Sequence, residues 1–149
     1  CFAPFFGEYR SYIANFGGKT VAVPPDTETF QPDLPAFLER VNPRTKAIIL
    51  NSPNNPTGVV VTEENLTKMC GILRAKEAEY GHPIYLIADE PYRELVYDAD
   101  TVVPYLPNLY NDTFVCYSYS KSFSLPGERI GYICIPPQVP TRIKVSAPQ

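Results

Sequence analysis

A chain of 149 residues has the length of one ordinary domain and can bury a real hydrophobic core. Its net charge of -3 excludes the strongly basic surface that nucleic-acid-binding domains present, and no apolar stretch reaches the roughly 20 residues that span a membrane. With a single histidine and no Cys-x-x-Cys pair, the sequence gives no indication of a metal site.

The N-terminal third of the chain predicts short elements. Residues 8–16 are typical of a short helix that ends at a glycine pair, and residues 20–23 are typical of a short strand that ends at two prolines. Asp33 can cap a helix that runs to about residue 41, because an aspartate side chain at this position accepts a hydrogen bond from the first helical turn.

The remainder of the chain predicts strands in alternation with helices. Four apolar runs are typical of buried strands, at residues 46–50, 84–88, 113–117 and 130–135. A long helix is expected at residues 63–80, with Thr62 as its cap. Its apolar face is expected to consist of Leu66, Met69, Cys70, Leu73 and Ala78. This alternation predicts an α/β fold, with a mostly parallel sheet and helices on both faces. In such sheets, ligands bind beyond the carboxyl ends of the strands.

The segment from Ser118 to Tyr132 contains groups suited to a covalently held, phosphorylated cofactor. Lys121 follows a buried strand, and a lysine amine becomes a nucleophile when its surroundings favour the deprotonated form. The hydroxyls of Ser118 and Ser120 and the guanidinium of Arg129 are donors of the kind that a phosphate group requires. The alternative interpretation is an exposed lysine and an exposed arginine beside a serine-rich turn.

This segment resembles the lysine signature of the class I and II aminotransferases, which are pyridoxal-phosphate enzymes of fold type I. The resemblance implies that Lys121 holds pyridoxal 5'-phosphate as a Schiff base. It also implies that Ser118 and Arg129 bind the phosphate of the cofactor, with Ser120 beside them.

Two further motifs stand in the order that the family has. The run Asn51 to Gly58 is similar to the asparagine-proline loop, in which the residue that matches Asn55 donates to the phenolic oxygen of the cofactor. Asp89 and Tyr92 resemble the strand-end motif whose aspartate pairs with the pyridine nitrogen and whose tyrosine reaches the phenolic oxygen. A carboxylate at the nitrogen keeps it protonated, so that the ring can act as an electron sink. Taken separately, the two motifs could be an ordinary turn and a helix cap.

The start of the chain carries a weaker match. The run from Pro4 to Phe6 is similar to the family segment whose aromatic side chain stacks on the cofactor ring, which implies that role for Phe6. The alternative interpretation is ordinary packing of aromatic side chains. The resemblance runs from about residue 4 to residue 135.

The resemblance implies a partial cofactor-binding large domain at residues 1–135, followed by an irregular tail at residues 136–149. An N-terminal part of that domain and a C-terminal small domain, with its arginine for the substrate carboxylate, are expected to be absent from this chain. The implied activity is transfer of an amino group from an amino acid to a 2-oxo acid, with Lys121, Asp89 and Tyr92 as catalytic residues, in a homodimer.

Two other functions stay open. One is a carbon–sulfur β-lyase of the same fold, which shares the lysine and aspartate motifs. The other is a truncated domain that folds without catalysing a reaction, and we expect this chain alone to be inactive. Cys116 and Cys134 lie in apolar runs and are expected to be reduced core residues, which predicts a cytoplasmic protein.

Overall fold

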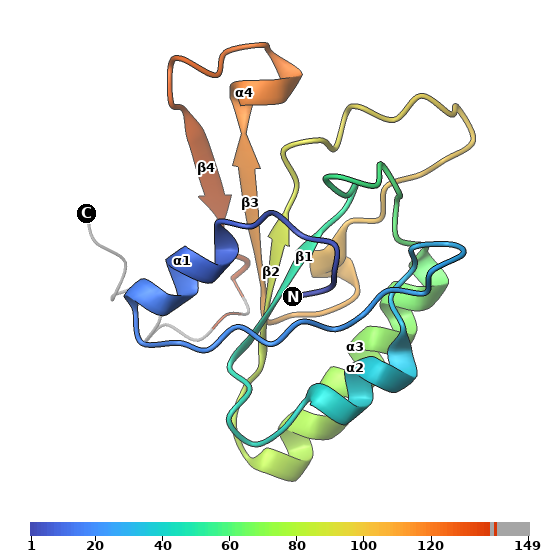
Figure 1. Ribbon diagram of the computed structural model, residues 1–149, viewed down its shortest axis with the longest axis vertical. Coiled ribbons are helices and arrows are strands. Elements are labelled where there is room, and N and C mark those ends of the chain that lie inside the picture. Colours follow the sequence, from blue (N-terminus) through green and yellow to red (C-terminus); the bar gives the residue numbers. More distant parts are fainter. Residues whose placement is uncertain (138, 140–149) are drawn as a thin grey trace.

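The computed structural model describes residues 1–137 and residue 139 (Figure 1). Within these residues the chain forms a four-stranded sheet in the order β1-β2-β3-β4. The strands are Ala47–Asn51, Tyr85–Asp89, Thr113–Ser118 and Gly131–Cys134. β1, β2 and β3 are parallel, and β4 is antiparallel to β3. The expectation of a mostly parallel sheet is therefore confirmed.

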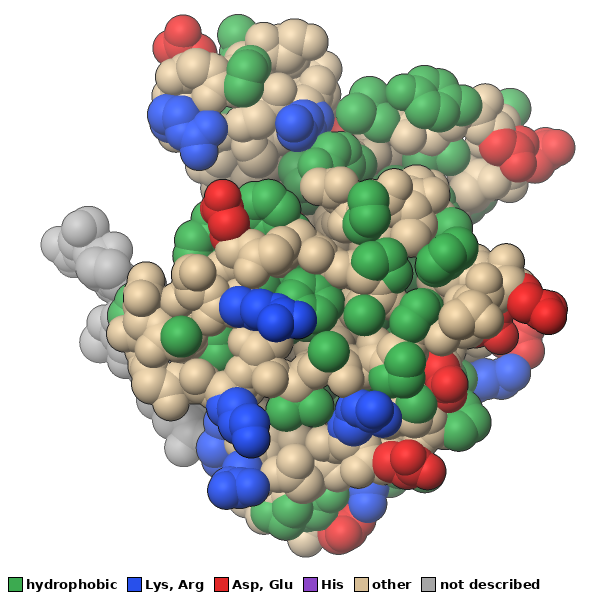
Figure 2. Space-filling model, viewed as in Figure 1, with side chains coloured by type: hydrophobic (Ala, Val, Ile, Leu, Met, Phe, Trp, Pro, Cys, Tyr) green, Lys and Arg blue, Asp and Glu red, His purple; other side chains and the backbone are tan. Residues whose placement is uncertain are grey.

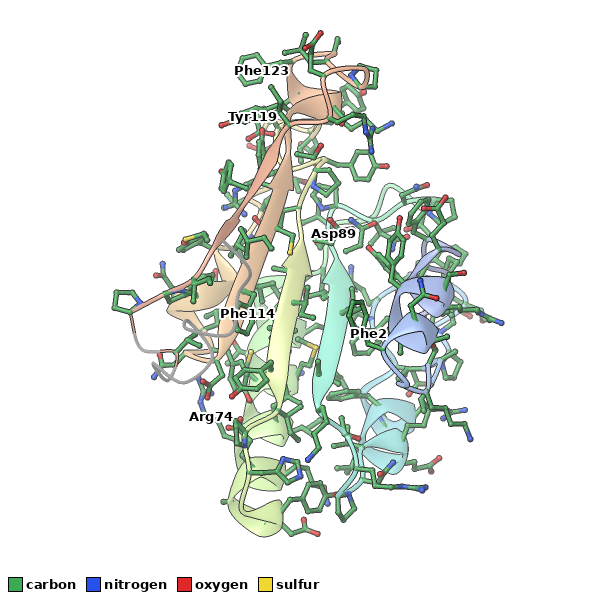
Figure 3. All side chains as sticks on the ribbon, turned by 90° about the vertical axis from the view of Figure 1, so that its left-hand side faces the viewer. Phe2, Arg74, Asp89, Phe114, Tyr119 and Phe123 are labelled. Atoms are coloured by element: carbon green, nitrogen blue, oxygen red, sulfur yellow. The ribbon has the colours of Figure 1, made fainter. Side chains whose placement is uncertain are left out.

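Helices lie on both faces of the sheet, as the sequence predicts (Figures 1 and 3). The helical segments are α1 (Tyr9–Asn15), α2 (Leu34–Arg40), α3 (Glu63–Tyr80), the 3-10 helix η1 (Leu106–Asn108) and α4 (Tyr119–Ser122). α3 covers one face and α1 lies on the other, and α2 packs against α3. None of the helices in the described part of the chain is long and apolar enough to cross a membrane.

The core fills the space between the sheet and α3. Four of the five residues expected on the apolar face of this helix are buried, namely Leu66, Met69, Cys70 and Leu73. They pack with Ile48 and Leu50 of β1 in one hydrophobic cluster, whereas Ile49 faces the N-terminal segment on the opposite side of the sheet. Ala78 is exposed, which is a correction, because it follows Leu73 by five residues and so lies about 140° around the helix from it, whereas Tyr80 in the same turn packs against the core.

The predicted caps fix where α2 and α3 begin. The carboxylate of Asp33 accepts a hydrogen bond from the backbone N–H of Ala36 at 2.9 Å. The hydroxyl of Thr62 accepts one from the N–H of Asn65 at 3.3 Å. Gly81 ends α3 with a φ of 69°, a conformation that favours glycine.

The strand predicted at residues 20–23 is wrong. Only Val23 forms a bridge, with Phe2, and its backbone N–H donates to the carbonyl of Cys1 at 2.9 Å. Pro24 and Pro25 follow at once and lack the N–H groups that a longer ladder needs. The irregular tail expected at residues 136–149 lies largely outside the described residues.

Candidate active site

The carboxyl ends of β1, β2 and β3 lie next to one another. Asn51 at the end of β1 is in register with Asp89 at the end of β2, and Asp89 is in register with Cys116 of β3. These ends and the segments that follow them carry the predicted site residues Asn55, Asp89, Tyr92, Ser118, Ser120 and Lys121. The parallel pairing thus brings the three motifs to one edge of the sheet.

Asp89 lies at the upper end of β2, where the sheet meets these segments (Figure 3). Its carboxylate is half-buried and accepts a hydrogen bond from the hydroxyl of Tyr9 in α1. Burial raises the pKa of Asp89, and the bond from Tyr9 acts in the opposite direction. A buried carboxylate with one neutral donor is well suited to a cationic partner such as a protonated ring nitrogen.

Tyr9 is a site residue that the sequence reasoning missed. It is the buried residue of an otherwise exposed helix, and burial together with the bond to Asp89 raises the pKa of its hydroxyl far above the usual value. The hydroxyl therefore stays protonated and can only donate to the carboxylate. No local sequence pattern indicates this contact, because it joins residues 80 positions apart.

Asn51 joins the asparagine-proline loop to β2. Its side-chain amide donates to the backbone carbonyl of Asp89 at 2.8 Å, and its side-chain oxygen accepts from the backbone N–H of Asn55 at 2.7 Å. The neighbouring Asn54 donates to the carbonyl of Pro4 at 3.3 Å, which links the loop to the N-terminal segment. The position of Asn55 is thus fixed by its neighbours in the fold.

A cleft of about 560 Å³ lies between this loop and the segment at residues 92–101. Asn55 and Tyr92 line it from opposite sides, together with apolar side chains such as Leu95 and Val96. Hydrophobic side chains also gather at the surface of the upper loops, where Tyr97 is exposed (Figure 2). Small-molecule sites are commonly clefts of about 300–1,000 Å³ with apolar walls and a few polar groups.

Lys121 lies in the short helix α4, directly after β3, in agreement with its predicted place beyond a buried strand. Its side chain is exposed, and its Nζ is 5.9 Å from the centre of the Tyr92 ring. An ammonium group at this distance from an aromatic face is attracted to it. The structure therefore brings together two of the three predicted catalytic residues.

The predicted phosphate-binding residues are brought together in part. The hydroxyl of Ser118 donates to that of Ser120 at 2.8 Å and accepts the N–H of Ser120 at 3.2 Å. The exposed guanidinium of Arg129 donates to the carbonyl of Pro126 at 3.0 Å. Within the described part of the chain, no hydrogen bond joins Arg129 to either serine.

Phe6 lies beside the buried tyrosine of α1. Its ring packs edge-on against Tyr9, with ring centres 5.8 Å apart, and its side chain is partly exposed. Because the hydroxyl of Tyr9 donates to Asp89, the side chain of Tyr9 lies between Phe6 and that carboxylate. Stacking of Phe6 on a cofactor ring stays a prediction.

Taken together, this edge of the sheet carries an amine, a half-buried carboxylate, an amide and several hydroxyls, and of the predicted site residues Asn55 and Tyr92 line the cleft. These groups suit an organic ligand with a carbonyl carbon, a basic ring nitrogen and an anionic group. Within residues 1–137 and 139, no group of three or more His, Cys, Asp and Glu side chains could hold a metal ion.

Comparison with known proteins identifies similar chains. The family model described as aminotransferase class I and II matches residues 1–147. A probable aspartate/prephenate aminotransferase from Aquifex aeolicus is 43% identical over 138 residues, which cover 90% of this chain and 34% of that protein. The chain thus spans about a third of the length of the relatives it matches.

Solved structures agree with this result. The crystal structure of an amino transferase from Eubacterium rectale has a TM-score of 0.90 at 52% identity, and the match covers 93% of this chain and 34% of that one. Aspartate aminotransferase from Thermus thermophilus, solved with maleate, has a TM-score of 0.77 at 32% identity, over 91% of this chain and 34% of that one.

Proposed function

Because this chain belongs to the family of class I and II aminotransferases, we propose that it is the cofactor-binding core of a pyridoxal-phosphate-dependent aminotransferase. Its substrates are an amino acid and a 2-oxo acid. The observation that carries the proposal is the shared edge of β1, β2 and β3, on which the asparagine loop, the Asp89 carboxylate and the Lys121 segment are neighbours.

The side chains present fit this cofactor. Pyridoxal phosphate has an aldehyde for an amine, a ring nitrogen for a carboxylate, a phenolic oxygen for donors and a phosphate for hydroxyls and a guanidinium. Lys121, Asp89 and Tyr92 supply the first three kinds of group, and Asn55 is a second donor on the cleft. Ser118 and Ser120 supply hydroxyls, and Arg129 supplies the guanidinium. When bound, the cofactor provides an electron sink that stabilises negative charge at the substrate Cα.

Each residue has a distinct task in this proposal. Asp89 holds a proton at the ring nitrogen, and Tyr9 keeps the carboxylate oriented by its hydrogen bond. Asn55 and Tyr92 donate to the phenolic oxygen. Lys121 would hold the aldehyde of the cofactor through its amine, and as a free amine it would move the proton at the substrate Cα.

Product analysis on the enzyme that contains this chain tests the proposed reaction. With an amino acid and a 2-oxo acid, we expect equimolar new 2-oxo acid and new amino acid, and neither product from a Lys121→Ala variant. Release of ammonia and a thiol from a cysteine conjugate, without a new amino acid, would instead identify a carbon–sulfur lyase. Lack of both activities would support the non-catalytic alternative.

A cytoplasmic location and a homodimer also belong to the proposal. The cysteines in the described part of the chain are free thiols, which agrees with a reducing compartment. The homodimer is implied by the family resemblance, and sedimentation of the enzyme that contains this chain measures it directly. A monomeric enzyme would contradict this part of the proposal.

A further inference from the structure

We propose that Asn51 is a positioning residue that sets the placement of Asn55 relative to Asp89, the two residues that would contact the phenolic oxygen and the ring nitrogen of the cofactor. This inference rests on the proposed function of these two residues. Asn51 begins the asparagine-proline loop, but the sequence gives it no role of its own, and it does not line the cleft that Asn55 and Tyr92 share.

The geometry behind this proposal consists of two hydrogen bonds from one side chain. The amide nitrogen of Asn51 donates to the backbone carbonyl of Asp89 at 2.8 Å, and the amide oxygen accepts from the backbone N–H of Asn55 at 2.7 Å. One bond reaches the last residue of the neighbouring strand, and the other reaches four residues forward into the loop. The side chain is therefore a bridge between the two motifs.

Burial makes the bridge stiff. Asn51 is 7% exposed, so that water does not compete effectively for either bond. Both partners are backbone groups, and a shift of this side chain would leave buried polar groups without partners. The backbone of Asn55 and that of Asp89 consequently move together.

Asparagine is well matched to this task. One bond requires a donor and the other an acceptor, and a primary amide offers both at its two ends. An aspartate can accept from Asn55 but cannot donate to the carbonyl of Asp89 when it is ionised. A leucine of similar volume can make neither bond. Asn51→Asp therefore removes the bond to Asp89 in β2 alone, whereas Asn51→Leu removes both bonds.

Ser52 provides a matched control. It is the next residue, is similarly buried at 6% exposed, and its hydroxyl accepts from the backbone N–H of Val61 at 2.9 Å. A Ser52→Ala change thus removes one buried hydrogen bond from the same loop without touching Asn55 or Asp89. The Ser52→Ala variant therefore measures the effect that a less stable loop alone has on the cofactor site.

The first measurement follows amide hydrogen exchange at Asn55 in the 149-residue chain without added cofactor. We expect exchange to become about five- to tenfold faster in Asn51→Leu, as for the loss of one neutral hydrogen bond. Asn51→Asp keeps the acceptor and should retain most of the protection at Asn55. Ser52→Ala should also retain it. Unchanged exchange in Asn51→Leu would overturn the inference.

The second measurement is titration with pyridoxal phosphate, followed by the pH at which the long-wavelength absorbance of the bound cofactor changes. Donors to the phenolic oxygen set this pH midpoint, so Asn51→Leu should shift it in the same direction as Asn55→Ala. Asn51→Leu should also weaken binding by about tenfold, the equivalent of one well-placed hydrogen bond. In Ser52→Ala we expect the same pH midpoint and the same affinity for pyridoxal phosphate as in the unaltered chain.

The outcomes separate this inference from the function on which it rests. If Asn51→Leu and Ser52→Ala weaken binding equally and neither moves the pH midpoint, Asn51 is only structural and the proposed function stands. If the unaltered chain does not bind the cofactor at all, both proposals are overturned.

Discussion

Asp89 is the residue on which the proposed chemistry depends most, and its surroundings decide its charge. Burial raises its pKa, whereas the hydroxyl of Tyr9 stabilises the ionised form. Tyr9 and Asp89 are 80 residues apart in the sequence, so their contact depends on the fold as a whole.

A Tyr9→Phe substitution tests the bond to this carboxylate. It removes the hydroxyl and keeps the ring, which packs against Phe6. We expect the free energy of unfolding at neutral pH to fall by about 1.5–3 kcal/mol, the usual range for a hydrogen bond to a charged group. Urea denaturation measures the change.

Tyr12→Phe is the matched control for this substitution. Tyr12 lies in the same helix, and its exposed hydroxyl donates to Glu8 at 2.5 Å. Because solvent can replace this bond, we expect little change in stability. If Tyr9→Phe and Tyr12→Phe lower the free energy of unfolding equally, the bond to Asp89 stabilises the chain no more than an exposed hydrogen bond does.

Asp89→Asn gives a pH-dependent prediction. The raised pKa means that the folded chain binds the proton of Asp89 more tightly than the unfolded chain does. The unaltered chain therefore loses stability, relative to the variant, as the pH rises from the ordinary aspartate range through the raised value. The difference in unfolding free energy, variant minus unaltered chain, should grow from about pH 3 to pH 7.

The comparison with the variant removes most other pH effects. The pKa of Glu90 is raised first by burial and least by the charge of Asp89, so that most of its contribution, being common to both chains, cancels in the difference. Denaturation curves at several pH values provide the data. A difference that does not change with pH would show that Asp89 has an ordinary pKa in the folded chain.

The sequence predicts some of these residues and not others. Asn55, Asp89 and Lys121 stand in recognisable patterns beside predicted strands. Tyr9 and Asn51 act through hydrogen bonds to Asp89 across 80 and 38 residues. Such contacts depend on how strands and helices pack, which no local pattern contains.

At the scale of elements, the sequence predicts the strands and long helix well because their signals are local and strong. β1 and β2 are apolar runs next to turn residues, and α3 has a cap, an apolar face and a terminal glycine. α4 was missed because four residues, Tyr119–Ser122, are too few for a periodic pattern. The failure at residues 20–23 has the same origin, since a short apolar run does not specify a pairing partner.

The segment after β2 is held in place by a buried ion pair. Glu90 is 3% exposed, and its carboxylate is 2.9 Å from the guanidinium of Arg93. The same guanidinium donates to the carbonyl of Val103 at 2.9 Å and to that of Pro104 at 3.3 Å. The start and the end of the segment that forms one wall of the cleft are thereby joined.

Arg93→Met should therefore destabilise the chain strongly. It leaves the Glu90 carboxylate buried without its cationic partner, a change that typically costs about 3–5 kcal/mol. Arg93 is partly exposed, so we expect the lower end of this range. Unfolding in urea measures the loss.

A double variant identifies the cause of that loss. Glu90→Gln combined with Arg93→Met removes the buried charge as well, and it should recover much of the stability of the single variant. If the double variant is as unstable as Arg93→Met, the loss comes from the hydrogen bonds to Val103 and Pro104 and not from the unpaired carboxylate.

At the scale of the whole molecule, a parallel sheet brings distant motifs to one edge. The asparagine loop, the Asp89 motif and the lysine segment follow three neighbouring strands, so that their order in the sequence becomes an order in space. The chain spans about a third of the relatives it matches, and within that third lie all the residues that we propose to contact the cofactor.

The most direct test of the proposed function is to reduce the chain with borohydride in the presence of pyridoxal phosphate and to map the labelled lysine by mass spectrometry. We predict one predominant phosphopyridoxyl group, on Lys121, and its loss in Lys121→Arg without new labelling elsewhere. Label distributed over other lysines, such as Lys19, Lys46 and Lys68, with Lys121 no more reactive than they are, would contradict the assignment of this site.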